Sequence, residues 1–385
     1  MTDPVPLLQS LIRCPSVTPA DAGALAALEA PLRAAGFACT RLPFSESGHP
    51  DIDNLYARYG KDGPHLSFSG HTDVVPPGPV SDWTHPPFAA DIADGFVWGR
   101  GAVDMKGGIA AFAAAALDVI AAGKCKGSIS FLITGDEEAD SVNGTAKMIR
   151  WLAEHGETPD HCIVGEPTCI ETLGDGVKIG RRGSIHVFLT VEGRQGHVAY
   201  PATVINPIHR MSRILDRLHS EPLDSGNRWF EPSILQCVSV DTDNTAGNVV
   251  PQRVTAWINI RYNTEHSPHS IELWLRERCD RVIADLGGSY VLDCRPKGSV
   301  FLTEPGRLSD VVSKAILETT GVTPVLNTGG GTSDARFIKD YCPVVEFGLR
   351  NRTIHQIDER VSVEELHALK ACYATIIERY FEAFA

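Results

Sequence analysis

Apolar positions in the first part of the chain follow two alternating patterns. Short apolar runs typical of buried strands, LSFS, SISFLIT and CIVG, alternate with segments in which apolar residues return every three or four positions. These helical segments include LLQSLIRC, ALAALEAPLRAAGF, GIAAFAAAALDVIAAG and AKMIRWLAEHG. Strands that alternate with helices indicate an α/β fold with a mainly parallel sheet and helices on both faces.

The pattern changes near residue 180. The segments SIHVFLTVEGR, IHRMSRILDRLHS, SILQCVSV, VTAWINIRYN, ELWLRERCDRVIADLG and SYVLDCRP predict the order β-α-β-β-α-β of a ferredoxin-like α+β unit. A helix, LSDVVSKAILETTG, the strands PVLNT and PVVEFG, and a long C-terminal helix then return to the first pattern. We therefore expect one domain of residues 1–180 and 296–385, with a second domain of residues 181–295 inserted into it.

The bulk composition limits the classes of protein to consider. The chain has 385 residues, of which 43% are hydrophobic and 22% charged, as in a globular protein of two domains. Its net charge of -13 argues against nucleic acid or an anionic membrane as a partner, because both favour basic surfaces. The most apolar segment is short for a membrane span and contains Asp118, so we expect a buried helix there.

The N-terminus and the cysteines bear on the location of the protein. The segment MTDPVPLLQSLIRC lacks a basic stretch followed by an apolar one, so it does not predict a secretory signal. The ten cysteines are scattered and form no C-x-x-C pair, which is typical of thiols in a reducing compartment. We therefore expect a cytoplasmic protein.

Three predicted strands of the first domain end in polar side chains that can bind metal ions or move protons. His71-Thr72-Asp73 follows LSFSG, Asp136-Glu137-Glu138 follows SISFLIT, and Glu166 follows CIVG. Two further candidates are Asp104, in a glycine-flanked turn before a helix, and His355, in a turn after VVEFG. Because the carboxyl ends of parallel strands share one edge of a sheet, we expect these side chains to lie close together.

Each of these residues alone has a plainer explanation. A lone histidine is usually a turn residue, Asp104 could cap a helix, and adjacent glutamates could be a solvated loop. Together, two histidines and three carboxylates are too many ligands for one tetrahedral zinc ion, but they suit two ions that share a bridging carboxylate. On ligand type alone Zn²⁺, Co²⁺ and Mn²⁺ fit equally well. One glutamate of the pair Glu137-Glu138 would remain free as a base.

The chain also resembles a known family. The blocks SGHTDVVPPG, WGRGAVDMKGGIAAF, ITGDEEADSVNGT, IVGEPT and GGGTSDARF…TIHQIDERV are similar to those of the co-catalytic metallopeptidases, a zinc-exopeptidase-like family that includes aminoacylases and carboxypeptidases. The resemblance implies a metal-dependent amidohydrolase with two divalent ions per subunit, Zn²⁺ in the first place and Co²⁺ as the alternative. It also implies that the inserted domain acts as a lid and joins two subunits into a homodimer.

The resemblance assigns roles to individual residues. The metal ligands would be His71, Asp104, Glu138, Glu166 and His355, with Asp104 as the bridge and a cis peptide bond after it. Glu137 would be the general acid/base. Asp73 would orient His71, which agrees with its position two residues along an extended segment.

The blocks GRRGS, QGHVAYP and NTGGGTSDARF resemble most closely the branch of the family that hydrolyses N-succinyl-LL-2,6-diaminopimelate to succinate and LL-2,6-diaminopimelate. Such a substrate carries several carboxylates, which guanidinium groups recognise well. The resemblance implies that His197 stabilises the oxyanion from the partner subunit. It implies the substrate contacts Arg181, Ser184, Tyr200, Asn248, Arg261, Thr328, Gly329 and Asn351.

Other functions stay open at this point. A related hydrolase, such as an acetylornithine deacetylase, an aminoacylase or a carboxypeptidase, would use the same metal centre on another acyl group. A non-enzymatic binding protein on the same fold would be expected to have lost Glu137 or a ligand, and none is lost. A nucleotide-binding protein is disfavoured because GRGAVDMKGG lacks the G-x-G-x-x-G spacing.

Overall fold

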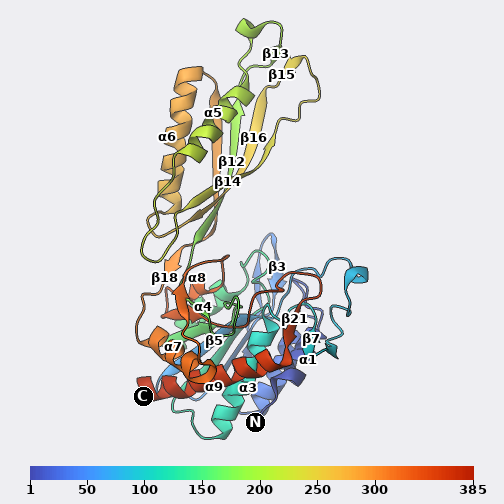
Figure 1. Cartoon of the computed structure of the whole chain (residues 1–385), viewed down its shortest axis with the longest axis vertical. Coiled ribbons are helices and arrows are strands. Elements are labelled where there is room, and N and C mark those ends of the chain that lie inside the picture. Colours follow the sequence, from blue (N-terminus) through green and yellow to red (C-terminus); the bar gives the residue numbers. More distant parts are fainter. The chain divides into compact units, whose positions relative to one another are not determined.

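The computed structural model describes residues 1–385 and divides into two compact units (Figure 1). The first unit comprises Met1–Ile179, Thr303–Asn327 and Ser333–Ala385, and the second comprises Gly180–Leu302 and Thr328–Thr332. The second unit continues to Leu302 because strand β18 (Phe301–Leu302) pairs with β11 (Gly180–Arg181). Its function as a lid and dimerisation domain stays a prediction.

An eight-stranded sheet forms the centre of the first unit. Strands β8, β5, β9 and β20 are parallel neighbours, whereas β1 and β4 continue the sheet in antiparallel fashion at one edge. At the other edge β10 is antiparallel to β20 and parallel to β19. In spatial order the strands are β1 (Ala38–Arg41), β4 (Leu55–Tyr59), β8 (Ser128–Thr134), β5 (His65–His71), β9 (His161–Val164), β20 (Val344–Glu346), β10 (Gly176–Lys178) and β19 (Val325–Asn327).

Helices cover both faces of this sheet. Every residue of β5 and β8 is buried, as expected for strands covered on both sides. Phe131 contacts Phe112 of α3, whereas its neighbour Leu132 packs with Met148 of α4, and consecutive strand residues point to opposite faces. The predicted α/β fold class is confirmed. The helices of this unit are α1 (Pro4–Ile12), α2 (Ala24–Ala34), α3 (Lys106–Ala121), α4 (Thr145–Glu154), α7 (Arg307–Thr320), α8 (Ala335–Ile338) and α9 (Val363–Phe384), with a short 3-10 turn η1 (Val80–Asp82).

Small additional strands lie outside the main sheet. A hairpin of β2 (Phe44–Glu46) and β3 (His49–Ile52) precedes β4. A three-stranded sheet of β6 (Ile92–Ala93), β7 (Phe96–Trp98) and β21 (Arg360–Ser362) joins two distant parts of the chain. These short strands were not predicted, because two to four residues carry too little periodicity to recognise.

The second unit has the predicted ferredoxin-like topology. Its four long strands, β12 (Gly183–Glu192), β14 (Ile234–Asp241), β16 (Arg253–Tyr262) and β17 (Ser289–Gly298), form an antiparallel sheet in the order β14-β16-β12-β17. Alternate residues of β12, beginning with Ile185 and Val187, pack against helices α5 (Pro207–Ser220) and α6 (Pro268–Leu286). A short ribbon of β13 (Gly196–His197) and β15 (Val249–Val250) and a 3-10 turn η2 (Pro201–Thr203) complete the unit.

Candidate metal centre

The carboxyl ends of the parallel strands bring the predicted ligands together. His71 is the last residue of β5, Glu138 lies in the loop after β8, and Glu166 lies in the loop after β9. Asp104 lies two residues before the first residue of α3, and the peptide bond that follows it, between Asp104 and Met105, is cis, which agrees with the resemblance. His355 lies in the loop between β20 and β21 with a φ of 58°.

Asp104 lies between the two histidines. Its Oδ1 atom is 3.3 Å from Nε2 of His71, and its Oδ2 atom is 3.3 Å from Nε2 of His355. Nε2 of His71 is also 3.8 Å from Oε1 of Glu166, and Nε2 of His355 is 2.9 Å from Oε1 of Glu138. We call His71, Asp104 and Glu166 the first ligand set, and Asp104, Glu138 and His355 the second ligand set. The two sets share only Asp104, so its carboxylate is placed to bridge two ions.

Opposite charges in the cluster shift the pKa values of both histidines. Burial lowers the pKa of His71, but its hydrogen bond to Asp104 and the negative charge of Glu137 outweigh burial and raise that pKa well above 6.5. Hydrogen bonds to Asp104 and Glu138 raise the pKa of His355 to about 10. Burial acts to raise the pKa of Asp104, but hydrogen bonds from His355 and His71 leave it lowered.

The residues present fit divalent metal ions. The donor atoms are imidazole nitrogens and carboxylate oxygens, and those of His71, Asp104 and Glu138 lie within 4.8 Å of one another. The same holds for His71, Glu137 and Glu166. Nitrogen and oxygen donors of this kind are typical ligands of Zn²⁺ and of similar first-row ions. Ions bound here would offset the negative charge that raises the pKa values of the histidines.

Glu137 lies beside the first ligand set. Its Oε2 atom is 4.0 Å from Nε2 of His71. Burial, together with the negative charge of Glu166, raises the pKa of Glu137 well above 4.5. A carboxylate with a raised pKa accepts a proton more readily, as a general base must.

Asp73 contacts both His71 and the loop after β8, and its predicted role in orienting His71 stays a prediction. Nδ1 of His71 lies 2.9 Å from the backbone oxygen of Asp73 and 3.6 Å from its Oδ1 atom, so the closer contact is with the carbonyl. The carboxylate of Asp73 instead accepts hydrogen bonds from the backbone N–H groups of Glu137 at 3.2 Å and Glu138 at 3.0 Å. Asp73 therefore joins the loops of β5 and β8. The sequence does not tell whether the carbonyl or the carboxylate of Asp73 contacts His71, because both groups belong to the same residue.

Asp136, the first acid after β8, shapes its own loop. Its carboxylate accepts hydrogen bonds from the backbone N–H groups of Ser141 at 3.2 Å and Asn143 at 2.8 Å. These bonds fold the segment after Glu138 back toward the end of the strand. The three consecutive acids therefore have separate surroundings.

Three residues that we did not assign from the sequence also belong to this site. Asp334 is buried, accepts a hydrogen bond from Oγ1 of Thr145 at 2.6 Å, and has no partner for its Oδ1 atom. Its negative charge contributes to the raised pKa of Glu137. Arg100 and Glu359 form a buried ion pair next to Asp104. All three lie in blocks that carried the resemblance, which was the available signal.

The predicted residues of the second unit fall into two separate groups. Arg181, Ser184, Arg261, Thr328 and Gly329 lie near the start of β12, where Ser184 is the cross-strand partner of Arg261. The other group is formed by His197, Tyr200 and Asn248, around the ribbon of β13 and β15. β12 runs for ten residues between them, which is about 33 Å of extended chain. Figure 1 shows β13 and β15 at one end of this unit and β18 at the other.

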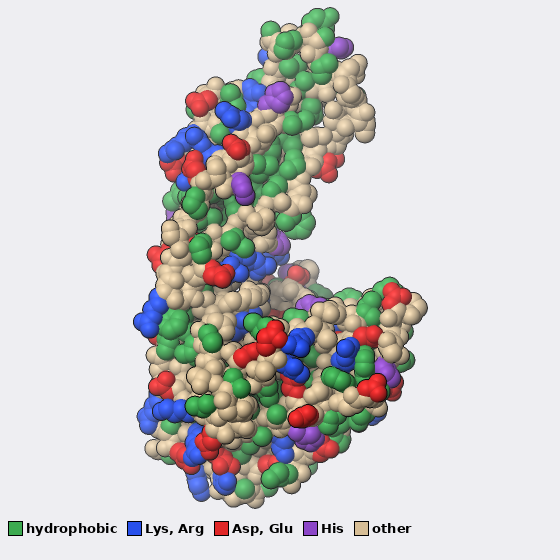
Figure 2. Space-filling view, in the orientation of Figure 1, with side chains coloured by type: hydrophobic (Ala, Val, Ile, Leu, Met, Phe, Trp, Pro, Cys, Tyr) green, Lys and Arg blue, Asp and Glu red, His purple; other side chains and the backbone are tan.

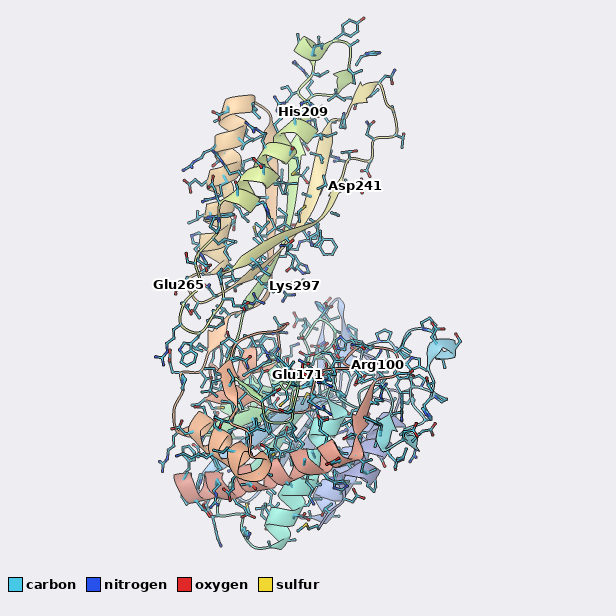
Figure 3. The ribbon with its side chains drawn as sticks, viewed as in Figure 1. Arg100, Glu171, His209, Asp241, Glu265 and Lys297 are labelled. Atoms are coloured by element: carbon cyan, nitrogen blue, oxygen red, sulfur yellow. The ribbon has the colours of Figure 1, made fainter.

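The first of these groups is rich in positive charge. Arg261 forms no ion pair, and burial with the nearby charge of Arg182 lowers its pKa. Burial and the charges of Lys297 and Arg261 likewise lower the pKa of His186. In Figure 2, Lys and Arg side chains gather at the end of the unit where Figure 3 labels Lys297. Cations in this arrangement repel one another and would be stabilised by an anion.

Other predicted contacts are fixed within their own units. Nη1 of Arg181 donates to the backbone oxygen of Gly331 at 3.1 Å, and Oγ1 of Thr328 donates to the backbone oxygen of Trp229 at 2.6 Å. His197 and Tyr200 are exposed, with ring centroids 5.7 Å apart. Asn351 lies in the first unit, where its backbone N–H donates to Cys169.

The sequence and the fold match those of characterised proteins. Residues 67–379 match the profile of Peptidase family M20/M25/M40. The succinyl-diaminopimelate desuccinylase of Rhodopseudomonas palustris strain TIE-1 is 55% identical over 377 residues, with 97% of each chain covered. That of Bradyrhizobium sp. strain BTAi1 is 54% identical over 384 residues, covering 99% of this chain and 100% of the relative.

Solved structures share the fold at low sequence identity. Aminopeptidase PepT from Bacillus cereus superposes with a TM-score of 0.81 at 22% identity, over 98% of each chain. The Bacillus subtilis YXEP protein, a dinuclear metal binding peptidase, gives a TM-score of 0.73 at 15% identity, over 99% of this chain and 98% of the other. None of the helices in the present chain combines the length and the apolar character needed to cross a membrane.

Proposed function

We propose that this chain, which belongs to Peptidase family M20/M25/M40, hydrolyses N-succinyl-LL-2,6-diaminopimelate to succinate and LL-2,6-diaminopimelate. This reaction is a step of lysine and diaminopimelate biosynthesis. The observation that carries the proposal is the match, over nearly the full length, to relatives named succinyl-diaminopimelate desuccinylase. The clustering of the candidate ligands beside a buried glutamate supports the same reaction class.

Two divalent cations complete the proposed site. The first ligand set would hold one ion and the second ligand set the other, with Asp104 shared between them. We propose Zn²⁺ as the ion, with Co²⁺ as the alternative for the same donors. When bound, such ions supply Lewis acidity that polarises the amide carbonyl and makes water more acidic.

Glu137 is the proposed proton carrier. It takes a proton from the attacking water as the carbon–oxygen bond forms, and it returns the proton to the leaving nitrogen as the carbon–nitrogen bond breaks. The raised pKa of Glu137 favours the first transfer, and the negative charges of Glu166 and Asp334 contribute to it. The new carboxylic acid gives its remaining proton to the amine, so the products are a carboxylate and an ammonium group, and Glu137 is ionised again for another cycle.

The arginine-rich end of the second unit is the proposed site for substrate carboxylates. Arg261 without an ion pair and the neighbouring Ser184, Arg181, Thr328 and Gly329 offer guanidinium, hydroxyl and backbone donors. The planar guanidinium can donate two parallel hydrogen bonds to one carboxylate, which the ammonium group of a lysine cannot do. We propose that Asn351 adds a contact from the first unit.

We further propose a homodimer through the second unit, in which His197 stabilises the oxyanion of the partner's site. Tyr200 and Asn248 lie in the same group as His197, about one strand length away from Arg261 in the same chain. Strand β14 is a free sheet edge with exposed Val238 and Val240, and exposed edges and apolar surface favour pairing with another chain.

Complementation between inactive variants tests the contribution of the partner. Co-expressed Glu137→Gln and His197→Ala chains form mixed dimers in which one site has both residues intact. Random pairing in a two-fold dimer then restores about a quarter of the wild-type activity. Activity no higher than that of the separate variants would refute a His197 supplied by the partner.

A substrate panel tests the activity itself. We expect the zinc-loaded protein to prefer N-succinyl-LL-diaminopimelate over N-acetylornithine and simple N-acyl amino acids, and Glu137→Gln to lose this activity. Preference for an acetyl substrate would reject the proposed acyl group but keep the metal centre.

We place the protein in the cytoplasm, which its ten free cysteines support.

A further inference from the structure

A buried ion pair between Glu359 and Arg100 lies beside the candidate metal centre. Nη1 of Arg100 is 2.7 Å from Oε2 of Glu359, and both side chains are almost fully shielded from solvent. Figure 3 labels Arg100 within the first unit. The two residues are separated by 259 positions in the sequence, and neither is a candidate ligand. Burying two charges is costly, so the pair calls for an explanation.

Glu359 fixes the turn that carries Asp104. Its Oε2 atom accepts a hydrogen bond from the backbone N–H of Gly101 at 2.9 Å. Its Oε1 atom accepts from the backbone N–H groups of Val103 at 2.8 Å and Asp104 at 3.1 Å. One carboxylate therefore binds three N–H groups of the turn in addition to Arg100. The main chain at Asp104 can move only if this carboxylate moves or gives up a bond.

Arg100 holds the loop that carries His355. Its Nη1 atom donates to the backbone oxygen of Gln356 at 3.2 Å, and its Nη2 atom contacts the backbone oxygen of His355 at 3.4 Å. Nη2 also lies 3.4 Å from the backbone oxygen of Pro76. The guanidinium carbon lies 5.4 Å from the centre of the Trp83 ring, which further restricts its position.

We propose that the Glu359–Arg100 pair is a positioning device that sets the separation of Asp104 and His355, and so controls the affinity of the second ligand set for its metal ion. The inference rests on the metal centre proposed above. Two of the three residues in the second ligand set are held by this pair, but only Asp104 in the first. The side chain of His355 is 47% exposed, so the contacts of Arg100 with its loop are needed to hold it in place.

Metal titration of Glu359→Gln tests this inference without a catalytic assay. In this variant the side-chain NH₂ group would face N–H groups that now donate to the carboxylate. The turn of Asp104 and the contact with Arg100 should therefore loosen. Protein stripped of metal by a chelator is titrated with Co²⁺, and binding is measured by calorimetry and by the visible absorption of the bound ion. Because the first ligand set depends on the pair only through Asp104, we expect its ion to be weakened less than the second ion, which should bind 10–100-fold more weakly, with an altered spectrum.

Two further variants make the result specific. Glu157→Gln breaks the Arg58–Glu157 pair, which neighbours Ser128 at the opposite end of β8 from the ligands, and should leave both affinities unchanged. Arg100→Lys keeps a charge for Glu359 but cannot span the carbonyl groups of His355 and Gln356. Arg100→Lys should also weaken the binding of the second ion. This variant keeps the inference testable if Glu359→Gln fails to fold.

The possible failures are distinguishable. Unchanged binding of both ions in Glu359→Gln, or equal weakening of both, would overturn the positioning function while the metal centre stands. A wild-type chain that binds fewer than two ions would overturn the proposed metal centre, and this inference with it.

Discussion

Nδ1 of His71 lies 2.9 Å from the backbone oxygen of Asp73, whereas the carboxylate of Asp73 accepts the N–H groups of Glu137 and Glu138. The acid therefore acts on the loop of Glu137, the proposed proton carrier, more directly than on the histidine. A residue that links one candidate ligand, His71, with the proposed base, Glu137, offers a sharp test of how the site is built.

Asp73→Asn should impair turnover more than metal binding. The amide can still accept one of the two N–H groups, but its NH₂ group would face the other, so Glu137 would lose its fixed position. We expect kcat to fall about 10–100-fold with KM little changed. Steady-state kinetics and metal content measured on the same sample check this. Loss of a bound ion at normal kcat per loaded site would instead mean that the carboxylate orients His71.

Arg261→Lys should weaken substrate binding although it keeps the positive charge. The half-buried guanidinium of Arg261 has no ion pair, and a lysine cannot reproduce its two parallel hydrogen bonds to a carboxylate. We expect KM for the succinyl substrate to rise about tenfold or more, roughly 1.4 kcal/mol per factor of ten. Arg295→Lys is the matched control, because Arg295 lies on the same sheet but is exposed and paired with Asp293. Equal effects in both variants would argue against a carboxylate site.

His65 should make the protein sensitive to mild acid. Burial, together with the charge of Arg58, lowers the pKa of this histidine to about 4, and its Nε2 atom lies 2.8 Å from Oγ of Ser130. The unfolded chain takes up a proton near pH 6.5, which the folded chain does not accept until about pH 4. The stabilisation is therefore complete above pH 6.5 and is lost as the pH falls toward 4, by about 2 kcal/mol between pH 6.5 and 5.

Urea unfolding at several pH values measures this effect. In His65→Gln the free energy of unfolding should depend less steeply on pH below 6.5 than in the wild type. His209→Gln, which removes an exposed histidine of the second unit, should keep the wild-type slope. A wild-type slope in His65→Gln would mean that other groups cause the acid sensitivity.

Removal of metal ions should abolish activity and lower the stability of the first unit. Ions that bind only the folded state stabilise it by about 4 kcal/mol when present at a thousand times their Kd. We therefore expect the thermal midpoint to fall after chelation and to recover on addition of Zn²⁺. The variant Glu137→Gln should recover in the same way, because Glu137 is not in either ligand set, whereas His355→Ala should recover only in part. Full recovery in His355→Ala would remove that residue from the proposed ligands.

The sequence by itself determined the class of the fold and the edge of the sheet at which the candidate ligands lie together. Apolar runs followed by His71, by Glu137 and Glu138, and by Glu166 predicted strand ends with ligands, and parallel strands place such ends along one edge. The periodicity of the second unit likewise gave its order of strands and helices. These features are local, because each depends on residues that are neighbours in the chain.

The tertiary structure decided the features that depend on distant partners. The sequence does not reveal that Glu359 holds the turn of Asp104, since 255 positions separate them and many acids could have taken that place. It also does not reveal that the carbonyl of Asp73, not its carboxylate, lies closer to His71. The structure also shows that His197 and Arg261 of one chain are separated by the extended length of β12. Packing fixes such relationships, because hydrogen bonds between segments that are distant in the sequence form only where the fold brings those segments together.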